Sequence, residues 1–147
     1  MSLHFTIVTV LTALILAWVG IRGGTPERWG AVVVGARYVL DMIYHWAWTV
    51  PTFFAVDPGH AAMDSLMLAV LVWLTLEANR VWPVWMAAGA LVAVLGHLMM
   101  LTGKDSVTPA YWATTNGPHY VQLLALLLGT LFHRWRLRRV GPYRDWS

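Results

Sequence analysis

The sequence contains no cysteine, and charged residues make up only 12% of its 147 residues. A typical soluble domain has about 25% charged residues. The absence of cysteine excludes disulfide bonds, thiolate nucleophiles, cysteine-ligated zinc and iron–sulfur clusters. The shortage of charge excludes a soluble enzyme, a disordered chain and a nucleic-acid-binding module, because 10 basic and 7 acidic side chains cannot cover a chain that is 59% hydrophobic.

Long apolar runs are what the sequence does contain, and each has about the 20 residues that a bilayer-spanning helix needs. Thr-Pro, Asp-Pro and Trp-Pro pairs mark the helix starts. We therefore predict an all-α, polytopic integral membrane protein with a single transmembrane domain over residues 1–147. Its five transmembrane helices are predicted at residues 3–21, 29–50, 58–78, 82–102 and 118–133. Between the last two, Thr108-Pro109 is expected to start a separate short helix that ends at Asn116-Gly117.

The basic residues predict the orientation of these spans. Eight arginines fall at span ends that share one side of the membrane, and only Lys104 falls on the other side. By the positive-inside rule, the N-terminus is outside and the C-terminus is cytoplasmic, in a bacterial-type cytoplasmic (inner) membrane. The basic tail between Arg134 and Arg139 is expected to contact anionic lipids of the bilayer. Glu77 and His133, at inner span ends, are interpreted as interfacial residues.

The most informative residues are the ionisable ones that fall inside predicted spans. In the span at residues 29–50, one helical face is polar and the opposite face is apolar. A charge at the bilayer centre costs roughly 2.5–3.5 kcal/mol, so the polar face must meet other helices or a wet cavity. The polar face consists of Arg37, Asp41, Tyr44, His45 and Trp48, and the apolar face of Ala36, Leu40, Ile43 and Ala47.

Two further spans place ionisable groups at a similar depth. Asp64 lies about two turns inside its span, while His45 and His97 each lie about five residues before the outer end of theirs, which is about 7–8 Å of helix. Small residues beside His97 allow close helix approach, so His97 is expected to face the bundle interior; they are Gly89, Ala93 and Gly96. The sequence thus predicts one polar layer of His45, Asp64 and His97 near the outer face.

Acids and histidines inside a membrane are typical of ion pathways and proton relays. We therefore predict an outward-facing intramembrane Asp/His site that binds or conducts a proton, a metal cation or a small cationic solute. Its candidate ligand- or ion-binding residues are Arg37, Asp41, Tyr44, His45, Asp64 and His97.

Other hypotheses stay open. His45, Asp64 and His97 are a possible ligand set for a divalent metal, and two histidines suit haem, although the sequence requires neither cofactor. Short loops also suit a non-catalytic accessory or assembly subunit of a larger membrane complex, or a homo-oligomer. The polar layer is also compatible with purely structural hydrogen bonds between helices. We expect no enzyme, because no complete catalytic motif is present. We also expect no nucleic-acid partner, because the basic residues fall at the ends of the predicted spans.

Overall fold

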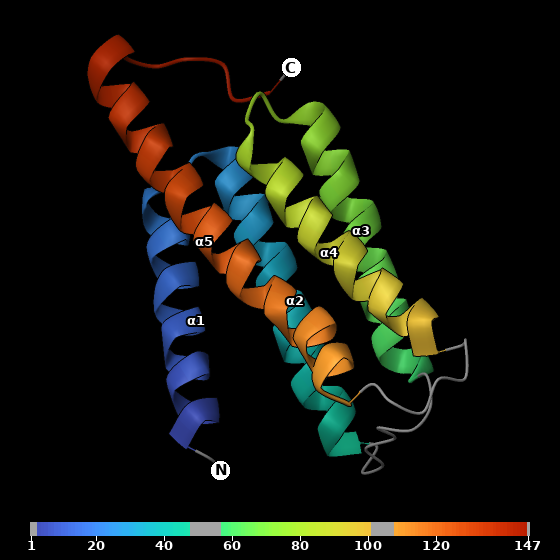
Figure 1. The fold of residues 1–147 in the computed structure, drawn as a ribbon. Helices are drawn as coiled ribbons and strands as arrows, with labels where there is room; N and C mark the ends of the chain where they lie inside the picture. Colours follow the sequence, from blue (N-terminus) through green and yellow to red (C-terminus); the bar gives the residue numbers. More distant parts are fainter. Residues whose placement is uncertain (1–2, 48–56, 101–107, 147) are drawn as a thin grey trace.

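Five α-helices run alternately up and down in the computed structural model of the protein (Figure 1). The structure describes residues 3–47, 57–100 and 108–146. The helices are α1 (Leu3–Arg22), α2 (Thr25–Ala47), α3 (Pro58–Glu77), α4 (Trp82–Met100) and α5 (Thr108–Val140). The fold is therefore all-α, as predicted.

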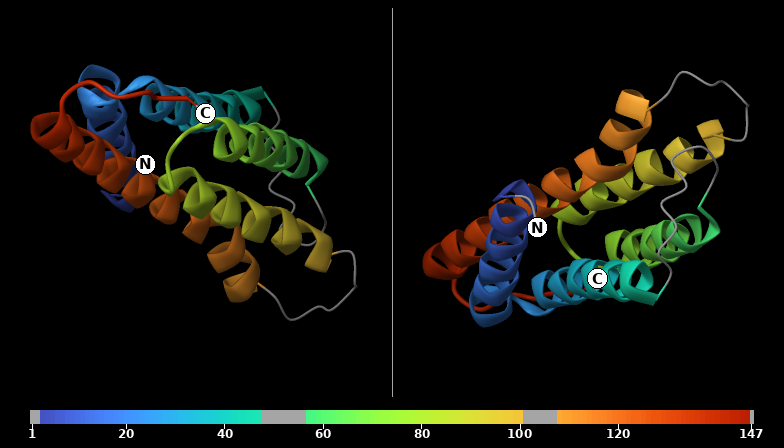
Figure 2. Two further views of the ribbon diagram at one scale, coloured as in Figure 1. Left: turned by 90° about the horizontal axis from the view of Figure 1, so that it is seen from above. Right: turned by 90° about the horizontal axis from the view of Figure 1, so that it is seen from below.

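The helices form a closed ring. Each helix packs against the next along the chain, α5 returns to contact α1, and α2 also contacts α5. The end-on views show α4 lying along α5 and α3 lying beside α4 (Figure 2). The two chain ends lie at opposite ends of the bundle, with the C-terminal tail crossing the end where α3 and α4 are connected (Figure 1).

Three of the predicted spans agree closely with helices of the structure. α1, α3 and α4 begin where predicted, although residues 101 and 102 of the fourth span lie outside the described residues. α3 begins where Asp57 accepts hydrogen bonds from the backbone N–H groups of Gly59 (2.9 Å) and His60 (3.3 Å). α2 begins at Thr25, four residues before the predicted span. Pro26 lies in its first turn, where proline is well tolerated, so the helix starts at the Thr25-Pro26 pair.

The prediction for the last helix was wrong in its start. α5 begins at Thr108 and continues through Pro118, whereas we expected a short helix followed by a break. Helix α4 supports this proline: a Cβ atom at Gly89 would lie 3.5 Å from the Pro118 Cβ atom. Packing of the two helices therefore outweighs the helix-breaking tendency of proline. α5 ends at Gly141, whose φ of 77° suits the left-handed cap and whose N–H donates to the Leu137 carbonyl (3.1 Å).

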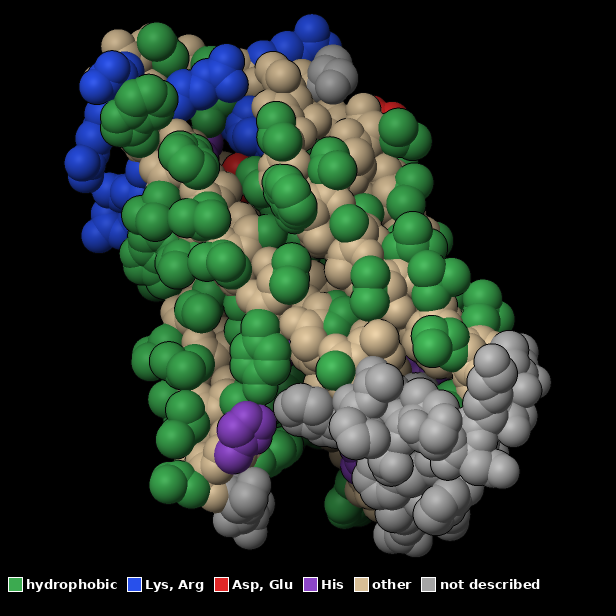
Figure 3. Space-filling model, viewed as in Figure 1, with side chains coloured by type: hydrophobic (Ala, Val, Ile, Leu, Met, Phe, Trp, Pro, Cys, Tyr) green, Lys and Arg blue, Asp and Glu red, His purple; other side chains and the backbone are tan. Residues whose placement is uncertain are grey.

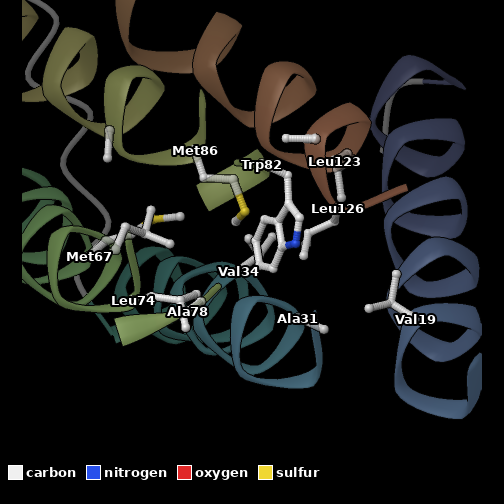
Figure 4. Close-up of a cluster of buried hydrophobic side chains, with 13 residues drawn as sticks. Val19, Ala31, Val34, Met67, Leu74, Ala78, Trp82, Met86, Leu123 and Leu126 are labelled. Carbon is white, nitrogen blue, oxygen red and sulfur yellow. The ribbon is translucent and has the colours of Figure 1, made fainter. Parts of the chain in front are cut away.

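An apolar cluster fills the half of the bundle that includes Trp82, the first residue of α4 (Figure 4). The Trp82 indole lies among side chains of α2 and α5, and Gly30 and Gly129 leave room for it, since a Cβ atom on either would lie within 2.8 Å of the ring. Other members of the cluster are Val19, Ala31, Val34, Met67, Leu71, Leu74, Met86, Leu123 and Leu126.

The outer surface of the bundle is also apolar. Large hydrophobic side chains are exposed along every helix, for example Leu14 (62%), Leu66 (63%) and Phe132 (64%). Among the described residues, α1, α3 and α4 are long and apolar enough to cross a membrane. Basic side chains gather at the end of the bundle that carries the C-terminal tail (Figure 3). These are the properties of a membrane protein.

Candidate functional site

Three members of the predicted polar face of α2 lie toward the bundle, whereas Trp48, like residues 49 and 50 of the predicted span, lies outside the described residues. Arg37, Asp41 and Tyr44 are half-buried, whereas Ala36, Leu40, Ile43 and Ala47 on the opposite face are exposed. The helix therefore turns Arg37 and Asp41 toward its neighbours, as the cost of a charge in lipid requires.

Arg37 links α2 to a buried pair on α3 and α4. Its Nε donates to Asp64 Oδ1 (2.6 Å), and one of its terminal nitrogens donates to Asp41 Oδ1 (2.9 Å). The other oxygen of Asp64 lies 3.0 Å from His97 Nε2. Asp64 is 6% exposed and His97 only 3%. The structure thus brings Asp64 and His97 together in the bundle interior, with a guanidinium on the other side of the carboxylate.

The close approach of α4 and α5 helps to bury this pair. A Cβ atom at Gly96, beside His97, would lie 2.7 Å from Thr114 Oγ1 of α5. Larger residues at this position would push the two helices apart. The stripe of small residues therefore has the role that the sequence suggested.

A second branch of hydrogen bonds runs from Asp41 toward the start of α3. His60 Nε2 lies 2.9 Å from Asp41 Oδ1, and His60 Nδ1 lies 2.9 Å from Asp57 Oδ2. Tyr44 Oη donates to Asp57 Oδ1 (2.7 Å). Partial burial favours the neutral form of Asp57, but hydrogen bonds from Tyr44 and His60 hold its pKa below the ordinary value.

These two branches form one connected set, which we call the polar network. Its three carboxylates face one guanidinium, so with neutral histidines it carries two excess negative charges. Its members are Arg37, Asp41, Tyr44, Asp57, His60, Asp64 and His97.

His45 does not join Asp64 and His97, so the predicted layer of these three residues is not formed. The His45 side chain is 57% exposed and its Nε2 lies 3.9 Å from Asp41 Oδ2. A helix turns by about 100° per residue, so four-residue steps drift by about 40°, and two such steps from Arg37 carry His45 to the edge of the polar face. His60 of α3, whose side chain is 17% exposed, makes the closer contact with Asp41. Among the described residues, the group close enough to share a metal ion is Asp41, His45 and His60, whose ligand atoms lie within 4.8 Å of one another.

A cavity of about 340 Å³ borders the polar network, and residues of all five helices contribute to its walls. Arg37, Asp41 and Asp64 line one side, and His119 of α5 lies on another. His119 stacks on Tyr38 (centroids 5.7 Å apart) and contacts Thr12 Oγ1 (3.0 Å). The cavity gives a small hydrated solute or water access to both carboxylates.

Toward the basic end of the bundle the polar network stops at an apolar layer. Val34 follows the network on α2, Leu71 on α3 and Met86 on α4, and all three are at most 1% exposed. Leu126 of α5 completes the layer with no exposed surface. No described hydrogen bond crosses these four side chains, so the network is open toward one end of the bundle and closed toward the other.

Beyond this layer lies a second buried acid, Glu27, which our sequence analysis missed. Glu27 is fully buried, and its Oε1 accepts hydrogen bonds from Trp82 Nε1 (2.9 Å) and Arg80 Nε (3.2 Å). An acidic residue in the first turn of a helix is common and favourable, so the sequence gave no reason to expect burial. The signal that could have revealed it is Trp82, whose indole N–H needs a partner when buried.

The C-terminal tail closes over Glu27. Arg80 donates to Asp145 Oδ1 (2.5 Å), and the Thr25 backbone N–H donates to Asp145 Oδ2 (3.2 Å). Partial burial favours the neutral form of Asp145, but the Thr25 N–H and the Arg80 charge hold its pKa below the ordinary value. His133 is only 8% exposed and its Nδ1 lies 2.7 Å from Tyr143 Oη. His133 is therefore an interior residue beneath the tail, not the interfacial residue that we expected.

A larger cavity, of about 750 Å³, opens between α4 and α5 at this end. Basic and aromatic groups line one part of it, among them Arg80, His133 and Arg136, and none of the described residues in its walls is acidic. Trp85, Leu128 and other apolar side chains line the remainder. Figure 3 shows basic side chains gathered around this end of the molecule.

No protein-family model, curated protein or solved structure matches this chain. Inference of its function therefore depends on the site itself.

Proposed function

We propose that the protein is an integral membrane protein whose polar network binds a cation, either a proton or a metal ion. The observation that carries this proposal is the buried contact of Asp64 with His97, bridged by Arg37 to Asp41. These ionisable groups lie within a bundle that otherwise exposes apolar side chains. Groups that are so costly in a membrane are generally retained for ion or proton binding.

The charge of the polar network favours a cation over an anion. Its three carboxylates outnumber its one guanidinium, and in a region of low dielectric constant such an excess of acidic groups favours binding of positive charge. Carboxylate and imidazole groups in contact can also exchange a proton near neutral pH. The adjoining cavity of about 340 Å³ offers room for water or a hydrated ion beside Asp41 and Asp64.

Binding is better supported than continuous conduction. Val34, Leu71, Met86 and Leu126 separate the polar network from Glu27 with fully buried apolar side chains. An ion in this layer would lose its hydration without gaining a ligand. We therefore propose uptake and release at one face.

We also propose that all five helices span a bacterial-type inner membrane, with the N-terminus outside and the C-terminus cytoplasmic. Most arginines lie at the end opposite the polar network, as the positive-inside rule requires of a cytoplasmic end. The polar network then faces the outside.

At the cytoplasmic end we propose an anionic lipid as a partner. The larger cavity combines apolar walls with Arg136 and with Arg80, which also pairs with Glu27 and Asp145, and none of the described residues in its walls is acidic. An acyl chain against Trp85 and Leu128, with its phosphate near the arginines, would match both parts of this lining.

Ligand-dependent thermal stability tests the proposed cation binding. A ligand present at 100 times its Kd stabilises the folded state by about 2.7 kcal/mol. We expect that at least one of H⁺, Na⁺, K⁺, Mg²⁺, Ca²⁺ or Zn²⁺ raises the melting temperature of the purified protein in detergent in a saturable manner. Asp64→Asn should abolish this response, because it removes the central carboxylate with little change of shape.

The matched control is Glu77→Gln, which removes an exposed acid from the other end of the same helix. It should respond as the wild type does. The proposal is wrong if none of these cations changes the wild-type melting curve, or if Asp64→Asn and the wild type respond equally.

A further inference from the structure

The polar network includes one group of side chains that could coordinate a metal directly. Asp41, His45 and His60 present a carboxylate and two imidazoles whose ligand atoms lie within 4.8 Å of one another. Asp41 and His45 belong to α2, and His60 belongs to the first turn of α3. All three lie at the open end of the network, and His45 is largely exposed.

We infer that Asp41, His45 and His60 form a binding site for a divalent transition metal of the Zn²⁺, Cu²⁺ or Ni²⁺ class. This inference rests on the proposed function and deepens it, because it assigns the cation and its ligands. Two imidazoles and one carboxylate favour these metals over Mg²⁺ or Ca²⁺, which prefer oxygen ligands throughout.

The distances suit such a site. Zn–N and Zn–O bonds are about 2.0–2.2 Å, so neighbouring ligand atoms in a tetrahedral site are about 3.3–3.6 Å apart. His60 Nε2 lies 2.9 Å from Asp41 Oδ1, and His45 Nε2 lies 3.9 Å from Asp41 Oδ2. These two separations lie on either side of the ideal value. Small rotations of the side chains, of which that of His45 is exposed, would bring all three ligands into place.

The outer hydrogen bonds also match a metal-binding histidine. Such a histidine usually donates its second ring N–H to a carboxylate, which fixes the tautomer and orients the ring. His60 Nδ1 lies 2.9 Å from Asp57 Oδ2, so Asp57 can hold the His60 tautomer whose Nε2 carries the free lone pair. Tyr44 in turn donates to Asp57 (2.7 Å), and its ring packs edge-on against His60 (4.9 Å). The sequence therefore provides both a ligand set and its support.

The balance of charge sets the expected valence. Arg37 also donates to Asp41, so one positive charge already adjoins the site. Histidine binds a metal in its neutral form, and with neutral histidines the carboxylates of Asp41, Asp57 and Asp64 leave two negative charges after Arg37 is counted. A divalent ion would neutralise this excess, whereas a monovalent ion would leave one charge unbalanced.

Calorimetric titration of the tag-free protein with ZnCl₂, NiCl₂ or CuCl₂ tests the inference. We expect one ion per chain for the wild type. Asp41→Asn and His60→Gln should lose measurable binding, and Asp57→Asn should weaken it about 10- to 100-fold. His45→Gln should weaken binding at least tenfold, and because His45 is exposed this variant keeps the fold testable.

His4→Gln is the matched control, since it removes an exposed histidine from α1. It should bind as the wild type does. The inference is overturned if the wild type takes up no stoichiometric metal, or if His45→Gln and His60→Gln both bind as tightly as the wild type.

The two proposals fail separately. If Asp64→Asn abolishes a response to protons or to main-group cations while no transition metal binds, the metal site is wrong and the proposed function stands. If a transition metal binds through His45 and His60 but Asp64→Asn leaves every cation response unchanged, the metal site stands and the role given to the buried Asp64–His97 pair is wrong.

Discussion

The contact between Asp64 and His97 can be measured as a coupling free energy. Asp64→Asn and His97→Gln, made singly and together, form a double-mutant cycle that isolates this pair from the other contacts of each side chain. Asp64→Asn also weakens the hydrogen bond from Arg37 (2.6 Å), but this effect is present in both Asp64 variants and cancels from the coupling.

The expected size follows from the environment of the pair. Removing one partner of a buried ion pair destabilises a protein by about 3–5 kcal/mol. The asparagine keeps an acceptor for Arg37, and Asp41 still neutralises that guanidinium, so we expect a loss of about 2–3 kcal/mol for Asp64→Asn. Side-chain couplings in membrane bundles average about 0.6 kcal/mol with a maximum near 1.7. Because both side chains are buried and Asp64 also accepts a hydrogen bond from the Arg37 guanidinium, we expect a coupling of about 1–1.5 kcal/mol, in the upper part of this range.

The assay is the free energy of unfolding of the four proteins, from denaturant titration in mixed micelles. A control cycle pairs Glu77→Gln with His97→Gln. Glu77 lies on the same helix as Asp64 but is thirteen positions further along the chain and exposed, so its coupling to His97 should be within about 0.5 kcal/mol of zero. A coupling for Asp64 and His97 no larger than that of the control would refute the packing of α3 against α4 described above.

Three further outcomes test other parts of the structure. Gly96→Ala should destabilise the fold by about 1–3 kcal/mol, because the new Cβ atom would collide with Thr114. Gly20→Ala in α1, where nothing lies within 4 Å of a Cβ atom, should be neutral or stabilising by up to about 1 kcal/mol. Chemical denaturation of the two variants measures this difference. Because folding lowers the pKa of Asp145, its contribution to stability is present above the unfolded pKa of about 3.9 and is lost as the pH falls through the lower folded pKa. Asp145→Asn should remove this acid-sensitive part of the stability. Protease cleavage of the tail between pH 2 and pH 6 measures it. In this cysteine-free chain, His45→Cys and Arg136→Cys should react with an impermeant maleimide from opposite sides of the membrane, and labelling from the same side would contradict the proposed topology.

The sequence predicted those features that depend on helical period and on the cost of charge in lipid. The polar face of α2 could be predicted because Arg37 and Asp41 recur every four residues while the opposite face stays apolar. Asp64 could be placed inside its span because the helix from Asp64 to Glu77 is too short to cross a bilayer. His97 could be assigned to the interior because small residues lie beside it on the same helix. The depth of an ionisable residue within its predicted span could thus be calculated from the sequence.

The direction in which a side chain points from the helix axis was harder to predict. His45 has the same calculated depth as Asp64, but the turn per residue carries its side chain to the edge of the polar face, and His60 of α3 makes the closer contact with Asp41. Contacts between residues far apart in the sequence also could not be predicted. The burial of Glu27 depends on Trp82 and Arg80 and on a tail more than a hundred residues away, none of which a local pattern reveals. The continuity of α5 through Pro118 likewise depends on its packing against Gly89 of α4.

A count of the positive charges bound per chain tests the central claim most directly. Equilibrium dialysis against single cations, combined with back-titration of protons, gives this number for the wild type and for Asp41→Asn/Asp64→Asn. We predict that the wild type binds one divalent ion, or protons in its place, and that the double variant binds neither at the same concentrations. Equal uptake by the two folded proteins would contradict the claim that the polar network is a cation site.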